Sequence, residues 1–246
     1  MRCWRCGAGK TTEGARTYDE GREKLKRVPQ HEILDSDTVG LEEAAQSLRD
    51  LRWVNRWFGG VRVTADLLRR AMRARNLRSA SVLEVAAGDG YSIAQATRRL
   101  RAEGLEIEAL CLDRRPLPPQ ARCCERAIVG DALALPFSPA SFDFVSCGLF
   151  LHHLAPAQAL QFLNGALKVA RHAVLINDLR RSRLHLAAVY SGWPLFRSRI
   201  SFIDGLASVR QAYTPHELRA LIHQSQARAS ELRNMYLFRM AAIAWK

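Results

Sequence analysis

Residues 81–91 read SVLEVAAGDGY, and this stretch decides the fold. The apolar run at residues 82–86 has the length of a buried β-strand, and it breaks directly into a glycine turn at 87–90. Small residues in such a turn let the backbone pass close to a ligand. A helical pattern at 93–100 follows at once, so the segment begins an alternating α/β fold.

Strands and helices continue to alternate along the chain. Further strands are predicted at 107–112, 127–129, 142–147 and 173–176. A helix is predicted at 156–170, and a terminal antiparallel pair of strands at 231–245. Thr214, Pro215 and Glu217 have the order expected of a helix start, with threonine at the cap. We therefore predict an α/β fold with a doubly wound, mainly parallel, seven-stranded sheet.

An N-terminal helical extension is expected before this sheet. Apolar residues recur at three- and four-residue spacing from Leu41 to Phe58, and a second helix is predicted to start after Thr64. The stretch 184–210 is aromatic and is predicted to be irregular. Residues 1–30 are expected to be a disordered leader, residues 31–78 a helical segment and residues 79–246 a ligand-binding domain. Within that domain, an insertion near 180–212 is expected to form the pocket.

Composition and charge narrow the class of protein. Hydrophobic residues make up 48% of the chain, enough for a sizeable core, and no apolar run reaches the roughly 18–20 residues of a membrane span. The first ten residues lack the apolar core of a signal peptide, so a cytoplasmic protein is expected. The net charge is +13, but the basic residues, mostly arginine, are spread over several helices. This favours solvated helix faces over a nucleic-acid surface.

The cysteines do not indicate a metal site. Cys3 and Cys6 form one CxxC pair, but no second pair of ligands at short spacing follows. No metal is therefore expected. Cys111 and Cys147 fall in predicted buried strands and are expected to be reduced core thiols.

Two acidic residues stand at the ends of predicted strands. Asp113 follows the strand 107–112, and Asp131 follows the strand 127–129. In open α/β sheets the ligand binds outside the carboxyl ends of the strands. One carboxylate could accept the two ribose hydroxyls and the other a purine amino group, so these residues indicate a nucleoside-binding site. The dinucleotide fingerprint GxGxxG does not fit, because residues 86–91 read AAGDGY.

The spacing E-x-A-x-G-x-G from Glu84 to Gly90 resembles the first motif of class I S-adenosylmethionine-dependent methyltransferases, (D/E)-x-G-x-G-x-G. Ala86 departs from the first glycine of that motif. The resemblance spans about residues 40–246 and is supported by GDALALPF at 130–137 and SFDFV at 141–145. It is closest to the group that includes ubiquinone- and menaquinone-biosynthesis methyltransferases.

A narrower set of segments is similar to small bacterial methyltransferases of secondary metabolism, encoded beside polyketide synthases, that methylate phenolic products. These segments are LRWVNRWFGG at 51–60, LFLHHL at 149–154, NDLRRSR at 177–183 and SVR at 208–210. The acceptor implied by this resemblance is a small molecule, a phenolic or polyketide-like compound that receives the methyl group on oxygen.

The resemblance implies a Rossmann-like methyltransferase fold and S-adenosylmethionine as cofactor. Glu84 would orient the methionine amino group, Asp113 would hold the ribose, and Asp131 with Ala132 would hold the adenine. The full implied cofactor set is Glu84, Ala86, Gly88, Asp89, Gly90, Asp113, Arg114, Asp131, Ala132, Cys147 and Leu149.

Methyl transfer to oxygen also needs a group that removes the acceptor proton or holds a phenolate. His152 and His153 follow the fourth predicted strand, at the mouth of the site, and a histidine titrates in the required range. The alternative is that they hydrogen-bond the following helix start. The further candidates for the acceptor pocket are Arg56, Asn177, Asp178, Tyr190 and Phe196.

Two other functions stay open. The basic charge is compatible with an RNA (ribose) methyltransferase, although residues 147–150 read CGLF where enzymes that methylate base amines usually carry an Asn/Asp-Pro-Pro-aromatic motif. A catalytically inactive partner protein that binds S-adenosylmethionine would retain the same acidic residues. The oligomeric state is open, because no self-pairing pattern is present.

Overall fold

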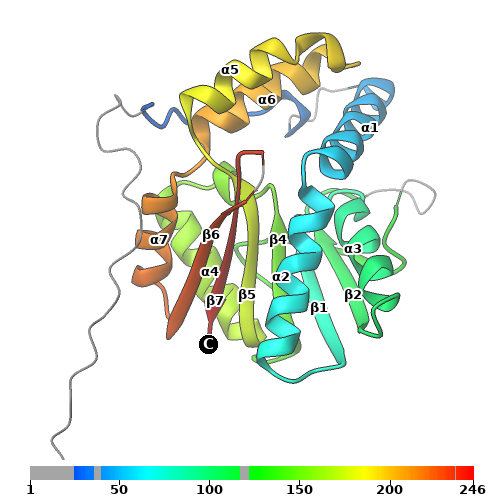
Figure 1. Ribbon diagram of the computed structural model, residues 1–246, viewed down its shortest axis with the longest axis vertical. Coiled ribbons are helices and arrows are strands. Elements are labelled where there is room, and N and C mark those ends of the chain that lie inside the picture. Colours follow the sequence, from blue (N-terminus) through cyan, green and yellow to red (C-terminus); the bar gives the residue numbers. More distant parts are fainter. Residues whose placement is uncertain (1–24, 36–39, 117–121, 236) are drawn as a thin grey trace, which may run out of the picture.

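A seven-stranded sheet forms the centre of the computed structural model, which describes residues 25–35, 40–116, 122–235 and 237–246 (Figure 1). The strand order is β3-β2-β1-β4-β5-β7-β6. The strands are β1 Ser79–Val85, β2 Glu106–Asp113, β3 Ala127–Val129, β4 Phe142–Gly148, β5 Ala170–Leu179, β6 Ala229–Met235 and β7 Arg239–Trp245.

The first five strands are parallel, and β7 is antiparallel to both of its neighbours, β5 and β6. The strand order reverses between β1 and β4, and such a switch point is where open α/β sheets bind ligands. The predicted doubly wound, mainly parallel fold is therefore confirmed.

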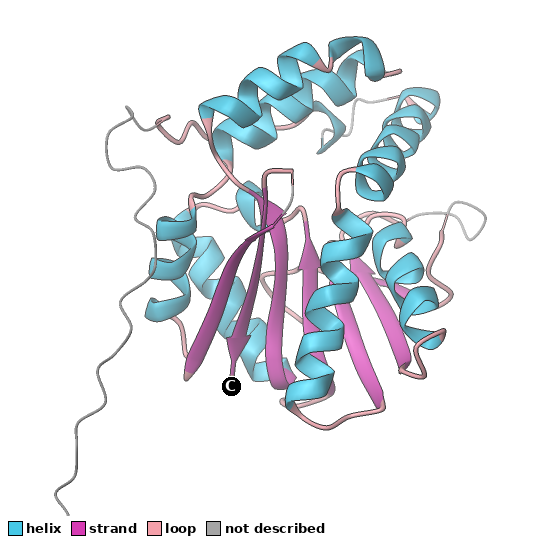
Figure 2. Ribbon diagram, in the orientation of Figure 1, coloured by secondary structure: helices cyan, strands magenta, loops and turns pink. Residues whose placement is uncertain are grey.

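Helices cover both faces of the sheet (Figure 2). One face packs against α2 (Gly60–Ala74) and α3 (Tyr91–Arg101), and the other against α4 (Pro156–Val169) and α7 (Pro215–Gln224). Strands β4 and β5 are buried along most of their length, which explains their near-continuous apolar sequence.

The start of α7 has the predicted capping box. The hydroxyl of Thr214 accepts a hydrogen bond from the amide of Glu217 at 3.3 Å, and the Glu217 carboxylate accepts one from the amide of Thr214 at 2.8 Å.

A cap of further helices lies over the carboxyl ends of the strands (Figure 1). It consists of η1 Ile33–Asp35, α1 Leu41–Trp57, α5 Arg183–Ser191, η4 Trp193–Leu195 and α6 Arg199–Gln211, and the short helix η3 Leu151–His153 lies beneath it. The prediction of an irregular stretch at 184–210 is wrong, because α5 and α6 fill it. Their apolar residues lie on more than one side of each helix, so no single helical stripe stands out in the sequence.

The second helix also begins earlier than predicted. It starts at Gly60, so Thr64 lies inside α2, where its hydroxyl accepts a hydrogen bond from the side-chain amide of Asn177 at 3.0 Å. The left-handed conformation of Gly59, with φ of 83°, makes the tight junction that lets α2 follow α1 at once.

Residues 25–35, which we call the N-terminal strap, run along the cap. Most of the predicted leader, residues 1–24, lies outside the described residues. Within the strap, the Arg27 guanidinium donates to the backbone carbonyls of Gln211, His152 and Leu154 at 2.7 to 2.9 Å. The strap is therefore joined both to α6 and to the region around η3.

Cys111 and Cys124 form a disulfide with Cα atoms 6.5 Å apart, which corrects the expectation that Cys111 is a reduced thiol. The loop before β3 returns Cys124 to the side of β2, and sequence spacing does not reveal that approach. Cys147 is free and buried. No helix in the described part of the chain is both long and apolar enough to cross a membrane.

Candidate functional site

A cavity of about 910 Å³ lies between the carboxyl ends of the strands and the cap. One half is lined by the glycine turn and the ends of β1 and β2, and the other by η3, the strap and α6. We call these the turn half and the cap half. A volume near the upper end of the usual range for ligand pockets leaves room for a large ligand or for two smaller ones.

The backbone of the glycine turn is left-handed at three positions. Ala86 and Gly88 both have φ of 54°, and Gly90 has φ of 73°. A Cβ on Gly90 would lie 2.5 Å from the Cβ of Cys124, so this position requires glycine for space as well as for conformation. Ala86 departs from the glycine motif and still adopts the conformation that glycine favours.

Asp113 fixes the turn to the end of β2. One oxygen of its carboxylate accepts a hydrogen bond from the amide of Gly88 at 2.7 Å, and the other accepts one from the amide of Arg115 at 3.0 Å. The cavity lining here also includes Arg114, Asp131 and Ala132.

The Glu84 carboxylate is buried at the end of β1 and faces the same cavity. Burial raises its pKa to about 7, although a hydrogen bond with Ser146 acts in the opposite direction. Its Oε2 atom has no hydrogen-bond partner among the described residues. A Cβ added to Gly148 would make an ordinary van der Waals contact with Oε1, at 3.6 Å. A buried carboxylate oxygen without a donor fits a ligand that brings one, such as an amino group.

Asp89 is engaged within the protein. It forms an ion pair with Arg52 of α1 and accepts a hydrogen bond from the amide of Tyr91 at 2.9 Å. The structure therefore places this predicted cofactor residue as a link between the turn and the cap. Cys147 is buried behind the lining, and Leu149 lines the cavity with φ of 54°.

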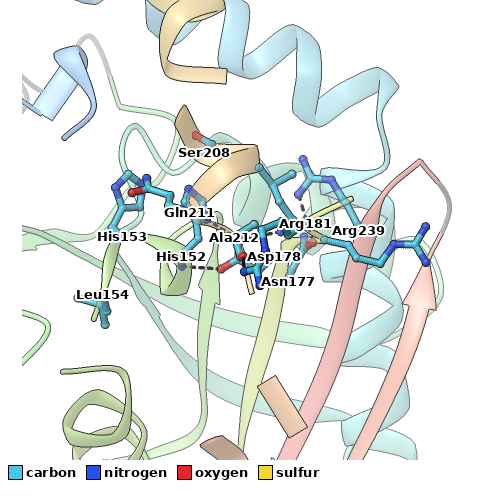
Figure 3. Close-up of polar contacts among 12 residues, drawn as sticks. His152, His153, Leu154, Asn177, Asp178, Arg181, Ser208, Gln211, Ala212 and Arg239 are labelled. Atoms are coloured by element: carbon cyan, nitrogen blue, oxygen red, sulfur yellow. Dashed lines mark hydrogen bonds and ion pairs between the residues drawn. The ribbon is translucent and has the colours of Figure 1, made fainter. Parts of the chain in front are cut away.

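His152 lies in the cap half between the carboxylate of Glu32 and that of Asp178, and Figure 3 shows its contact with Asp178. Its Nδ1 is 2.6 Å from Oδ1 of Asp178, and its backbone amide donates to Oδ2 of the same residue at 3.0 Å. Its Nε2 lies 3.5 Å from Oε1 of Glu32. The Asp178 contacts fix the orientation of the ring and direct Nε2 toward the strap.

The two carboxylates determine the charge of this histidine. Burial lowers the pKa of His152, but the charges of Asp178 and Glu32 and their hydrogen bonds outweigh that effect and raise the pKa to about 10. Burial likewise opposes ionisation of both carboxyls, yet contact with His152 holds the pKa of each below its usual value. At neutral pH the cluster is an imidazolium between two carboxylates.

His153 is next to this cluster, with its Nε2 3.8 Å from Oε2 of Glu32. The ligand-type atoms of Glu32, His152 and His153 lie within 4.8 Å of one another, a spacing that a metal ion could bridge. The proton on His152 offsets one of the two negative charges, and the side chains of Ser208 and Gln211 donate hydrogen bonds to the Glu32 carboxylate.

The remaining predicted pocket residues lie in different places. Asn177 lines the cavity, but its side chain donates to the Gly60 carbonyl at 2.9 Å and accepts from Arg239 at 3.2 Å, so it holds α2 against the sheet. Phe196 lines the cavity. Arg56, stacked over Trp57, and the half-exposed Tyr190 are not part of the lining.

Three residues important to the cap half were missed in the sequence. Glu32 lies in a segment without periodicity, and Ser208 and Gln211 were not assigned a role. Ser208 donates to Oε1 of Glu32, and the Gln211 side-chain amide donates to the same oxygen at 2.9 Å. The segment SVR at 208–210 was the only part of this group marked in the sequence, and no pattern near it predicts a contact with residue 32.

Comparison with known proteins gives a match that covers the central part of the chain. Residues 82–173 match the family described as "Methyltransferase domain". The matched residues run from β1 into β5 and include the glycine turn between β1 and α3. A comparison with curated proteins finds no match.

Solved structures with the same fold as this chain share little sequence with it. The plantazolicin methyltransferase BpumL, in complex with a monoazolic desmethylPZN analog and SAH, is 13% identical, with a TM-score of 0.60 over 83% of this chain and 95% of that chain. A SAM-dependent methyltransferase from Aquifex aeolicus is 13% identical, with a TM-score of 0.52 over 72% of this chain and 88% of that chain.

A third structure is an O-methyltransferase family 2 protein from Planctomyces limnophilus in complex with apigenin. It is 18% identical, with a TM-score of 0.58 over 86% of this chain and 63% of that chain. At these identities the likeness establishes the fold. The resemblance to the ubiquinone and menaquinone group stays a prediction.

Proposed function

We propose that the protein transfers the methyl group of S-adenosylmethionine to an oxygen of a small aromatic acceptor, phenolic or polyketide-like. The observation that carries this proposal is the His152 imidazolium, fixed between Asp178 and Glu32 at the wall of a cavity that it shares with the glycine turn. A donor site and an oxygen-binding group thus face one space.

The turn half would hold the cofactor, which supplies an activated methyl group when bound. The unpartnered oxygen of Glu84 would accept from its amino group, and Asp113 would accept from its ribose hydroxyls. Asp131 and Ala132, which line the cavity beyond Asp113, would hold the adenine. Leu149 lines the same cavity.

The cap half would hold the acceptor oxygen through His152. A phenol has a pKa of about 10, close to that of this imidazolium, and a hydrogen bond from Nε2 would favour the phenolate over the phenol. The contact of Nε2 with Glu32, at 3.5 Å, is longer than a strong hydrogen bond, so the same N–H can serve an incoming oxygen. On this view the phenol loses its proton to solvent, and His152 stays charged and holds the anion, with Asp178 fixing its ring.

The wall of the cavity supports an aromatic acceptor. Apolar side chains of the cap, including Leu51, Val54 and Phe196, line it beside the polar cluster. Pockets of this composition orient a mostly apolar ligand through a few polar groups. The apigenin complex of the Planctomyces limnophilus protein is a case of a small aromatic molecule bound to this fold.

Calorimetric titration with S-adenosylmethionine and its demethylated product tests the donor half. We expect Asp113→Ala to weaken binding about tenfold or more, or about 1.4 kcal/mol, because it removes the acceptor for the ribose. Glu108→Ala, an exposed carboxylate on the same strand, serves as the matched control and should bind as the wild type does. Absence of binding by the folded wild type would rule out the proposal.

Transfer of labelled methyl groups to a panel of phenolic compounds tests the acceptor half. We expect products methylated at oxygen, and a loss of about a hundredfold in rate for His152→Gln with cofactor affinity retained. Transfer to RNA with none to phenolics would support the ribose methyltransferase instead. Cofactor binding without transfer to either class would support an inactive cofactor-binding protein.

A further inference from the structure

The outer surface of the cap carries large apolar side chains that no described residue covers. We call this surface the outer cap patch, formed by residues of α5, η4 and α6, namely Leu184, Tyr190, Trp193, Leu195 and Ile203. Leu184 is 69% exposed and Leu195 is 57% exposed. Exposed apolar side chains are ordinary one at a time, but their concentration in one short segment marks an interaction surface.

Helix α5 is apolar on both of its sides. On the inner side His185 and Val189 line the cavity. On the outer side Leu184, Ala187 and Ala188 are exposed. A helix that is apolar all round is normally buried all round, so its outer side is built to be covered.

The charge of residues 180–203, which carry the outer cap patch, indicates what kind of surface covers the patch. Residues 180–203 contain five arginines and no aspartate or glutamate. Arg183, Arg197 and Arg199 are exposed at the ends of α5 and α6, beside the patch. Apolar and aromatic side chains bordered by arginine, without acidic residues, are the composition of surfaces that lie on anionic lipid.

We propose that the outer cap patch docks on the surface of an anionic lipid bilayer. Trp193 and Leu195 would enter the boundary between headgroups and acyl chains, and the exposed arginines would contact lipid phosphates. A second copy of the chain fits less well. A symmetric pairing through this patch would bring Arg183, Arg197 and Arg199 of both copies together with no acidic residue in the segment to offset them.

Docking would place the cavity directly behind the lipid surface. Val189 and Phe196 line the cavity from the same elements that carry the patch, so an apolar molecule dissolved in lipid would have only this layer to pass. The docking itself does not rest on methyl transfer, because it is a property of the outer surface alone.

Sedimentation of the full-length protein with lipid vesicles tests the proposal. We expect binding to vesicles of phosphatidylcholine mixed with phosphatidylglycerol, little binding to phosphatidylcholine alone, and weaker binding as the salt concentration rises. Leu184→Ser/Leu195→Ser should weaken binding about tenfold or more. The matched control is Val129→Ser, which changes a 58% exposed apolar residue on β3, and it should bind as the wild type does.

A second pair of variants separates local charge from net charge. Arg197→Gln/Arg199→Gln should weaken binding about tenfold or more, whereas Arg98→Gln/Arg99→Gln, which removes equal charge from exposed positions on α3, should have little effect. Circular dichroism and cofactor titration show whether each variant is folded. Because vesicle binding is measured without cofactor or acceptor, failure of docking and failure of methyl transfer are distinguishable.

Three results would overturn the proposal. The first is a folded wild-type protein that binds neither kind of vesicle. The second is equal loss of binding in the α3 and cap variants, which would indicate nonspecific attraction by net charge. The third is a dimer in light scattering that Leu184→Ser/Leu195→Ser dissociates, without vesicle binding, which would assign the patch to a second copy.

Discussion

The two halves of the cavity are built in opposite ways. The turn half comes from the ends of β1, β2 and β3, between residues 84 and 132, and leaves one buried carboxylate oxygen, on Glu84, without a partner among the described residues. The cap half joins Glu32, His152, Asp178 and Ser208 from four separate elements, and their charges and hydrogen bonds offset one another. The first half is incomplete without a ligand, whereas the second is preorganised in the free protein.

Of the variants considered, Asp178→Asn should cause the largest loss of stability, because it disrupts the charged cluster of the cap half. Asp178→Asn leaves the buried His152 beside a neutral amide, and breaking a buried charge pair in this way costs about 3–5 kcal/mol. We expect urea unfolding to show this loss of stability, and NMR titration to show a lower pKa for His152. Asp66→Asn, a carboxylate on the surface of α2, is the control. An unchanged His152 titration would contradict the assigned pairing.

Loss of the strap carboxylate should affect acceptor turnover alone. Glu32→Gln keeps a hydrogen-bonding oxygen for Ser208 and Gln211 but removes one of the two negative charges beside His152. We expect kcat/KM for the acceptor to fall about tenfold, or about 1.4 kcal/mol, with cofactor affinity unchanged. Steady-state kinetics together with calorimetry measure both quantities. A parallel loss of cofactor affinity would mean that the two halves are not independent.

The pH dependence of cofactor binding should identify Glu84. Its pKa is raised from 4.5 to about 7 by burial, and a cationic amino group favours the ionised form. Cofactor binding should therefore strengthen as the pH rises toward 7 and release a proton, which calorimetry in buffers of different ionisation enthalpy detects. Glu84→Gln should remove the proton release and flatten the profile.

The free energy of unfolding of the cofactor-free protein should fall as Glu84 ionises with rising pH, whereas cofactor binding strengthens. Because its pKa in the folded state is higher than in the unfolded state, its contribution is fully present below pH 4.5 and is lost as the pH rises through about 7. The difference in free energy of unfolding between wild type and Glu84→Gln should change over that range. A constant difference would show that the carboxyl titrates normally.

The smallest expected effect is at Ala86, where the turn departs from the glycine motif. Its φ of 54° is strained for alanine, so Ala86→Gly should raise the free energy of unfolding by about 1 kcal/mol or less. Ala140→Gly, at φ of 57° in a turn away from the cavity, should give a similar gain. Thermal unfolding measures both, and cofactor titration tests whether Ala86 alone also affects binding.

The sequence predicted those parts that depend on local patterns. The strand that breaks into a glycine turn, and the acid at the end of β2, are recognisable because spacing within a few residues defines them. The same reasoning placed His152 and Asp178 at the mouth of the site, since both follow strands of one parallel sheet.

Long-range contacts explain what the sequence did not reveal. Glu32 and Ser208 are 176 positions apart, and no periodicity links them. Cys111 and Cys124 pair only because a loop returns beside β2. Helices α5 and α6 of the cap were missed for a different reason: apolar residues on more than one side of each helix conceal the single stripe by which a surface helix is recognised.

The position of β7 has a consequence for folding during synthesis. It is the last element of the described chain to be made, yet it lies between β5 and β6 inside the sheet. Its buried Arg239 donates to the carbonyl of Phe58 at 2.9 Å and to the side chain of Asn55 at 3.0 Å, at the junction of α1 and α2. Until residues 239–245 emerge, β5 has an open edge and that junction lacks its anchor. A nascent chain therefore exposes a strand edge that invites aggregation until β7 is inserted.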